Sequence, residues 1–143
     1  ASYQDTSFVF QVWASARRAA ILPKGYLHYR VDNANSSVKS SAKVFAVCDE
    51  YELSREFLAK DPEKQRAFGA IVNLLKLGTY RWNFNRLTDE SRRAFAERMR
   101  EEYLRAREEG TLDRDMFAPA DWEMLNLMMD DFDAFMARFE SGM

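Results

Sequence analysis

The sequence predicts a mainly α protein, a helical bundle with a minimal β element. Gly and Pro are scarce, with five and three residues in a chain of 143. Glu, Arg, Ala, Leu and Met abound instead, and these residue types favour helices. Apolar residues recur at helical spacing along most of the chain. Only residues 26–31 combine aromatic and branched side chains in the manner of a strand.

Composition narrows the class of protein. Hydrophobic residues make up 47% of the chain, enough for a real core and too many for disorder. A net charge of −2 argues against a protein that binds nucleic acid through bulk charge. No apolar run approaches the length of about 20 residues that spans a membrane. The single cysteine, Cys48, excludes an internal disulfide and is expected to be a small buried residue.

The first 42 residues contain a helix, a strand and a polar loop. We expect a helix over residues 5–20, followed by the turn signal Pro23-Lys24-Gly25. Its expected apolar face consists of Phe8, Val9, Val12, Trp13, Ala16 and Ala20. The strand at 26–31 needs a partner, which is either residues 20–22 or a strand outside this sequence. Residues 32–41 are rich in Asn and Ser, and we expect them to form a loop.

From residue 43 to the end the pattern is helical. We expect helices over residues 43–59, 62–86, 88–110 and 118–139. Asp61-Pro62 is a good cap and first-turn pair, and Gly110 is a helix stop. Short connections between these helices indicate one bundle. The sequence therefore divides into residues 1–42 and a helical domain of residues 43–143.

Side-chain positions in this domain follow from helical spacing. One buried stripe is expected to contain Val44, Val47, Tyr51 and Leu58. Trp82 is expected in the core, and the charged residues between 101 and 109 are expected to form a solvated face. Gly69 either weakens its helix or marks close packing. The last helix is apolar over much of its surface, which indicates either burial or contact with a partner.

Two short stretches near the start could carry chemistry. Gln4-Asp5 stands where the first helix begins, and the helix dipole favours the charged form of a carboxylate there. The second stretch runs from His28 to Val38 and is rich in hydrogen-bond donors. Taken alone, Asp5 is an ordinary helix cap and the second stretch is a structural turn.

The residues of these two stretches, and their order in the chain, resemble the C-terminal end of a family 2 glycosyltransferase catalytic domain. In that family an acidic pair, sometimes Gln-Asp, precedes such a helix, and its Asp is the general base. The resemblance therefore implies that Asp5 is catalytic. The Tyr-Arg pair and the Asn-X-X-Ser-Ser-Val-like loop are similar to a bacterial subgroup that builds surface polysaccharides. The implied substrate-binding residues are Gln4, His28, Arg30, Asn33, Ser36 and Ser37.

The resemblance implies that residues 1–42 end a GT-A catalytic domain and that the rest is a helical appendage. The parent would be an inverting enzyme of the cytoplasm, and the inner face of the membrane is compatible with this location. It would transfer sugar from a nucleotide-diphosphate sugar to a saccharide or glycolipid acceptor, usually with Mg or Mn. The fragment itself is expected to be inactive and metal-free. Two stretches have the Asp-X-Asp spacing of the metal-binding motif in this family, Asp113-Arg114-Asp115 and Asp131-Phe132-Asp133. In the family that motif lies upstream of the catalytic base, whereas both stretches follow Asp5, so we do not expect them to bind a metal.

A second class of function stays open on sequence grounds. Residues 43–143 could form a non-enzymatic helical module for oligomerisation or interaction. Homo-oligomers and peripheral membrane contact are both compatible with the sequence, whereas nucleic acid is not an expected partner.

Overall fold

The computed structural model describes residues 3–26 and 43–143. Within these residues it contains helices and no strand. The helices are α1 (Gln4–Ser15), α2 (Ala46–Ala59), α3 (Pro62–Phe84), α4 (Asp89–Glu108), the short 3₁₀ helix η3 (Arg114–Met116), α5 (Pro119–Asp130) and α6 (Phe132–Arg138). The mainly helical fold predicted from the sequence is confirmed.

Local sequence signals set several of these boundaries. The Asp61 carboxylate accepts hydrogen bonds from the backbone N–H groups of Glu63 and Lys64, at 3.1 and 3.2 Å, and Pro62 opens α3. Thr88 precedes α4 but makes no side-chain cap. Gly110 ends the α4 region with a φ of +67°, a conformation that glycine adopts without a steric cost. The predicted cap at Asp61 and stop at Gly110 are confirmed.

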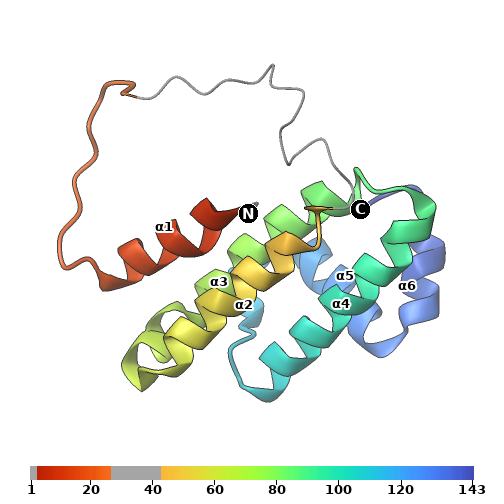
Figure 1. Cartoon of the computed structure of the whole chain (residues 1–143). Coiled ribbons are helices and arrows are strands. Elements are labelled where there is room, and N and C mark those ends of the chain that lie inside the picture. Colours follow the sequence, from red (N-terminus) through yellow and green to blue (C-terminus); the bar gives the residue numbers. More distant parts are fainter. Residues whose placement is uncertain (1–2, 27–42) are drawn as a thin grey trace.

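Each helix packs mainly against its neighbours in sequence (Figure 1). Helix α1 packs on α2, α2 on α3, α3 on α4, α4 on α5, and α5 on α6. From α2 onward, short connections make this arrangement natural, because a helix joined by a tight turn folds back on its predecessor. We call residues 43–143 the body and residues 3–26 the arm.

The core of the body is aromatic and sulfur-rich. Tyr80 lies between Tyr51 and Phe95, with ring centroids 5.5 and 5.4 Å away in edge-on geometry. The predicted stripe of Val44, Val47, Tyr51 and Leu58 is buried, and so is Cys48. The apolar residues of the predicted last helix are buried or half-buried against the same core, so core burial is confirmed there.

Glycine permits one close contact in this packing. A Cβ added at Gly69 would lie 3.0 Å from Cγ2 of Thr111, so α3 and the segment after α4 approach closely there. The alternative of close packing is the correct one for Gly69.

Several sequence-based expectations about the helices were wrong. The helix predicted over 118–139 is two helices, because the Asp131 carboxylate accepts from the N–H of Ala134 and starts α6. The first helix ends at Ser15, five residues before its predicted end. Residues 20–22 form no strand, so they do not supply the hairpin partner. Of the strand predicted at 26–31, all but Tyr26 lies outside the described residues.

Trp82 is not a core residue. Its side chain is 47% exposed, and the guanidinium of Arg86 lies 4.2 Å from its ring centroid. The helical pattern predicted a core position for Trp82, but its ring lies at the surface and makes a cation–π contact with Arg86.

The apolar face predicted for the first helix points to solvent. Phe8, Val9, Val12 and Trp13 are each 47–67% exposed. Helix α1 instead buries Ser7 and Ala14, the small residues of its opposite side, against α2. The hydroxyl of Ser7 donates to Glu50, and Phe10 packs edge-on against Phe68. Small side chains allow close approach of the two helices, which leaves the large ones outside.

The caps of α3 and α4 provide a matched stability test. Asp61→Ala removes two cap hydrogen bonds and should lower the free energy of unfolding by about 1 kcal/mol. Thr88→Ala occupies the same position in α4 but removes no cap bond, so its effect should be less than half as large. Urea denaturation followed by circular dichroism measures both. Equal losses for the two variants would contradict the assignment of the caps.

Candidate functional site

Asp5 lies in the first turn of α1 and its side chain is exposed. Gln4 precedes it as the first helical residue and is also exposed. Tyr3 has a φ of +64°, the one positive φ of a non-glycine residue among the described residues. The Tyr3 hydroxyl donates to Oδ1 of Asn83 on α3, at 3.1 Å. A left-handed turn and a long-range hydrogen bond thus hold the start of α1 on the body.

The remaining predicted site residues lie outside the described residues. These are His28, Arg30, Asn33, Ser36 and Ser37. The structure therefore brings together Gln4 and Asp5 on one helical turn, and the second stretch stays a prediction from the sequence.

A second polar cluster, which sequence reasoning missed, lies inside the body. Glu102 on α4 is 4% exposed and accepts from the Tyr80 hydroxyl at 2.7 Å and from Nε of Arg98 at 2.8 Å. Nζ of Lys76 on α3 lies 3.4 Å from the same carboxylate and 4.5 Å from the ring centroid of Tyr103. The expectation that Glu102 belongs to a solvated face was wrong, because these donors and the Lys76 ammonium stabilise its charge in the interior.

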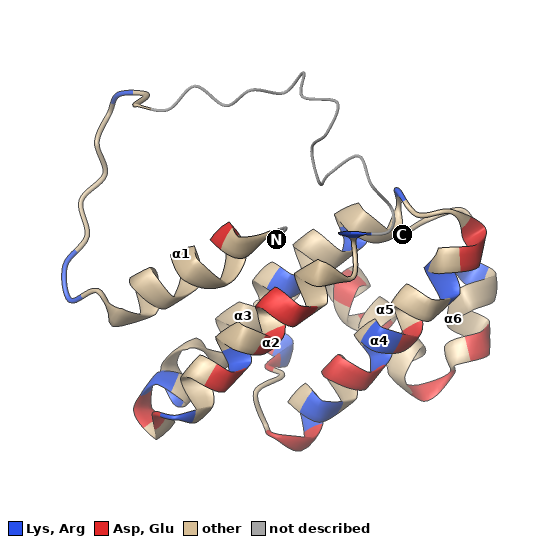
Figure 2. Ribbon diagram, in the orientation of Figure 1, with Lys and Arg blue, Asp and Glu red and all other residues tan. Residues whose placement is uncertain are grey.

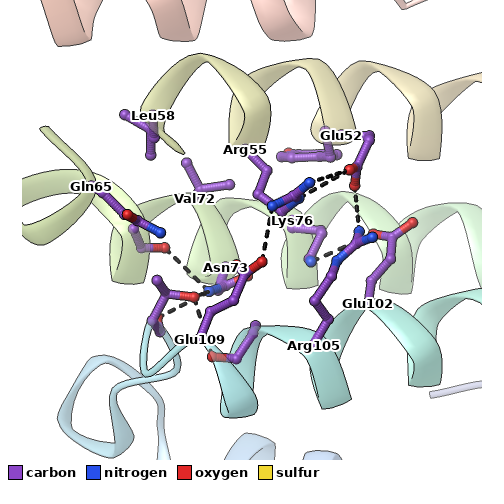
Figure 3. A pocket seen from close by; sticks show the side chains of 14 residues that line it. Glu52, Arg55, Leu58, Gln65, Val72, Asn73, Lys76, Glu102, Arg105 and Glu109 are labelled. Carbon is purple, nitrogen blue, oxygen red and sulfur yellow. Dashed lines mark hydrogen bonds and ion pairs between the residues drawn. The ribbon is translucent and has the colours of Figure 1, made fainter. Parts of the chain in front are cut away.

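Charged side chains from α2 and α4 cover this cluster (Figure 3). The Glu52 carboxylate accepts from Nη2 of Arg55 at 2.7 Å and also pairs with Arg105. Nη1 of Arg55 reaches Glu109 at 2.9 Å. The network therefore ties α2 to α4 above the α3 residues Lys76 and Asn73.

Burial changes the acid–base properties of the cluster. Desolvation lowers the pKa of Lys76, and the nearby Glu102 carboxylate opposes that shift only in part. Burial and then the charge of Glu102 raise the pKa of Tyr80 well above its ordinary value. The same two causes raise the pKa of Cys48 from 9.0 to about 12. The thiol is thus protonated at neutral pH and unsuited to nucleophilic attack.

The space inside the cluster is small. The cavity lined by Tyr51, Lys76, Asn73 and Arg105 offers about 20 Å³ to the centre of a water molecule. A volume of that size holds about one water. The arrangement can hold buried charge in a fixed geometry, but it has no room for a substrate. We therefore regard it as a stabilising centre and Gln4-Asp5 as the candidate chemical site.

One signal in the sequence could have revealed this cluster. Lys76 stands four residues after Val72 and four before Tyr80, on the buried stripe of α3. Glu102 likewise stands three residues after Met99 and four before Ala106, which are both buried. A charged residue on each of two core stripes indicates a buried pair.

The described residues do not fit the divalent metal that the resemblance implies for the parent. The carboxylate of Asp113 accepts from the N–H of Asp115 and caps η3. Asp131 caps α6, and Asp133 pairs with Arg93 at 3.0 Å. Among the described residues no three His, Cys, Asp or Glu side chains are grouped to hold a metal ion.

Comparisons with known proteins found no match to this chain among protein-family models, curated proteins or solved structures. Within residues 3–26 and 43–143, no helix is both long and apolar enough to cross a bilayer.

The buried pair yields a prediction about stability. Glu102→Gln leaves the Lys76 ammonium buried without its counter-charge and should cost about 3 kcal/mol of unfolding free energy. Adding Lys76→Met removes that ammonium and should restore at least about 1 kcal/mol. Urea denaturation at neutral pH measures both variants.

Glu101→Gln is the matched control, because Glu101 is the exposed neighbour of Glu102. It should change stability by less than about 0.5 kcal/mol. Equal effects at positions 101 and 102, or no recovery in the double variant, would show that the pair does not bear on stability.

Cys48 yields a prediction about pH. Its pKa is raised in the folded state, so its contribution to stability is complete below pH 9.0 and is lost as pH rises toward about 12. Between these values the unaltered chain should lose stability more steeply than Cys48→Ala, by up to about 1.4 kcal/mol per pH unit. Chemical denaturation across this range measures the difference, since the tyrosines titrate in both proteins. Parallel pH profiles would contradict the burial of a protonated thiol.

Proposed function

We propose that this chain is the C-terminal part of an inverting family 2 glycosyltransferase and that Asp5 is the catalytic base. In this proposal residues 1–42 end a GT-A catalytic domain and residues 43–143 are its helical appendage. The observation that carries it is the exposed Asp5 carboxylate in the first turn of a helix fixed to the body.

General-base catalysis of sugar transfer requires a carboxylate that is charged, accessible to the acceptor hydroxyl and held in position. The Asp5 carboxylate lies in the first turn of α1, at the positive end of the helix dipole. The left-handed Tyr3 and its bond to Asn83 restrict the motion of that turn, which favours a pre-set geometry. Asp5 would take the proton from an acceptor hydroxyl while the oxygen attacks the anomeric carbon. The nucleoside diphosphate would leave from the opposite face, so the configuration inverts.

Other residues of the resemblance have supporting roles in this proposal. Arg30 has the forked cation that suits a diphosphate, and Asn33, Ser36 and Ser37 offer hydrogen bonds to donor or acceptor. Gln4 and His28 would contact substrate beside Asp5. The described residues do not fit a metal, so Mg or Mn would be held by the donor-binding half of the parent. The parent is proposed to act in the cytoplasm.

The competing function, a helical oligomerisation or interaction module, has less support from the surface of the body. Among the described residues, most of the exposed large apolar side chains belong to the arm. Only Leu53, Leu75 and Trp82 are of this kind in the body. Leu75 borders the apolar groove beside α1, and exposed apolar residues as few as the other two are normal on a monomer.

Asp5→Asn tests the proposal in the parent enzyme. It should lower transfer by at least about 100-fold, since a positioned base typically contributes that much or more. Donor binding should be unchanged. A radiolabelled sugar-transfer assay and donor titration measure the two quantities. Asp49→Asn is the matched control, because Asp49 is an exposed first-turn acid of α2. Near-normal transfer by Asp5→Asn would remove Asp5 from the role of base.

A further inference from the structure

The arm concentrates most of the exposed large apolar side chains of the described residues. Ile21, Leu22 and Tyr26 are 94%, 63% and 70% exposed, beyond the end of α1. On α1 itself the exposed members are Phe8, Val9, Val12 and Trp13. These last four form one face. Positions 8 and 12 are four residues apart, as are positions 9 and 13, and positions 9 and 12, three apart, join the two pairs.

An apolar groove extends this face onto the body. It lies between α1 and α3, where Val9 and Trp13 face Phe68, Ile71 and Leu75. Its volume is about 360 Å³, measured as the space open to the centre of a water molecule. Leu75 is half exposed at its edge. The exposed apolar surface is therefore continuous rather than a set of isolated residues, which marks an interaction site.

Charge is distributed unequally between the arm and the body (Figure 2). The arm has one acid, Asp5, at the start of α1. Three cations, Arg17, Arg18 and Lys24, follow the end of α1, and all three are exposed. In residues 43–143 acids outnumber bases. An anionic surface would thus attract the arm and repel the body.

We propose that the arm docks on an anionic lipid surface, with the outer face of α1 in the interface and the three cations at the headgroups. Aromatic and branched side chains on one face, flanked by Lys and Arg, are typical of interfacial helices. The indole of Trp13 suits the boundary between acyl chains and headgroups. A second copy of the arm is a poorer partner than an anionic lipid surface, because its single acid, Asp5, could pair with only one of the three cations.

Docking bears on the choice of acceptor, a step that rests on the proposed role of Asp5. The base lies at one end of the same helix whose flank would contact the bilayer. The acceptor hydroxyl would therefore belong to a saccharide anchored in that bilayer, which is a glycolipid rather than a free sugar.

Vesicle binding by the 143-residue chain tests the docking directly. The chain should sediment with vesicles of phosphatidylglycerol and phosphatidylcholine, and much less with phosphatidylcholine alone. Binding should weaken as ionic strength rises from about 0.1 to 1 M, since the screening length falls from about 10 to 3 Å. Arg17→Gln with Arg18→Gln should weaken it by about 25-fold, at about five-fold for each cation.

The apolar contact has a matched control. Val12→Ser with Trp13→Ser should weaken binding at least ten-fold, while Leu53→Ser with Trp82→Ser should leave it unchanged. Leu53 and Trp82 are exposed to a similar degree but lie on the body. Circular dichroism checks that all variants keep their helices. In a chain with Trp82→Phe and Trp122→Phe, brominated lipids should quench the fluorescence of Trp13.

Three results would overturn the proposal. They are absence of binding to anionic vesicles at low salt, equal loss in the two serine pairs, and a dimer in light scattering that Trp13→Ser abolishes. Asp5→Asn should bind vesicles at least as tightly as the unaltered chain, because it removes the one acid of the arm. A failure of docking is therefore distinguishable from a failure of Asp5 as the base, which the transfer assay reports alone.

Discussion

Glu102 is the point at which α3 and α4 are joined by charge as well as by apolar contact. A buried carboxylate is costly unless donors surround it, and Tyr80, Arg98 and Lys76 meet that need from fixed positions. Slippage of either helix would separate these groups. The network of Glu52 and Arg55 then fixes α2 above them. Glu102 therefore fixes α3 relative to α4, and the Glu52 network placed over it fixes α2 relative to α4.

Features that local chemistry decides could be read from the sequence. The cap at Asp61 and the stop at Gly110 depend on residues a few positions away, and helical spacing found the α2 stripe. The buried Lys76–Glu102 pair escaped because charge alone suggests solvent. Helical spacing identified an apolar face on α1 but not the direction in which it points, which is set by the closer packing that Ser7 and Ala14 allow. Of the candidate site, the helix that holds Asp5 was predictable from the spacing of its apolar residues. The role of Asp5 as a base depends on its position relative to an acceptor hydroxyl, which neither the sequence pattern nor the fold contains.

The arm and the body divide the properties of the chain. The body buries its reactive and charged groups. Cys48 and Lys76 are both enclosed in it, and Lys76 is paired with Glu102. The arm exposes most of its side chains, among them the Asp5 carboxylate and the ring of Trp13. Chemistry and recognition in this protein are therefore expected on the surface of a short helix, while the larger helical part supplies a rigid support through contacts such as Tyr3 to Asn83.

The packing of each helix on its neighbours in sequence also has a kinetic consequence. Within the body, contacts between sequence neighbours require only small loops to close, and proteins rich in such contacts fold within microseconds to milliseconds. As the polypeptide leaves the ribosome, α3 can fold against α2 before α4 has been made. The body can thus acquire its shape progressively during synthesis, with little time for half-formed apolar surfaces to meet those of other chains.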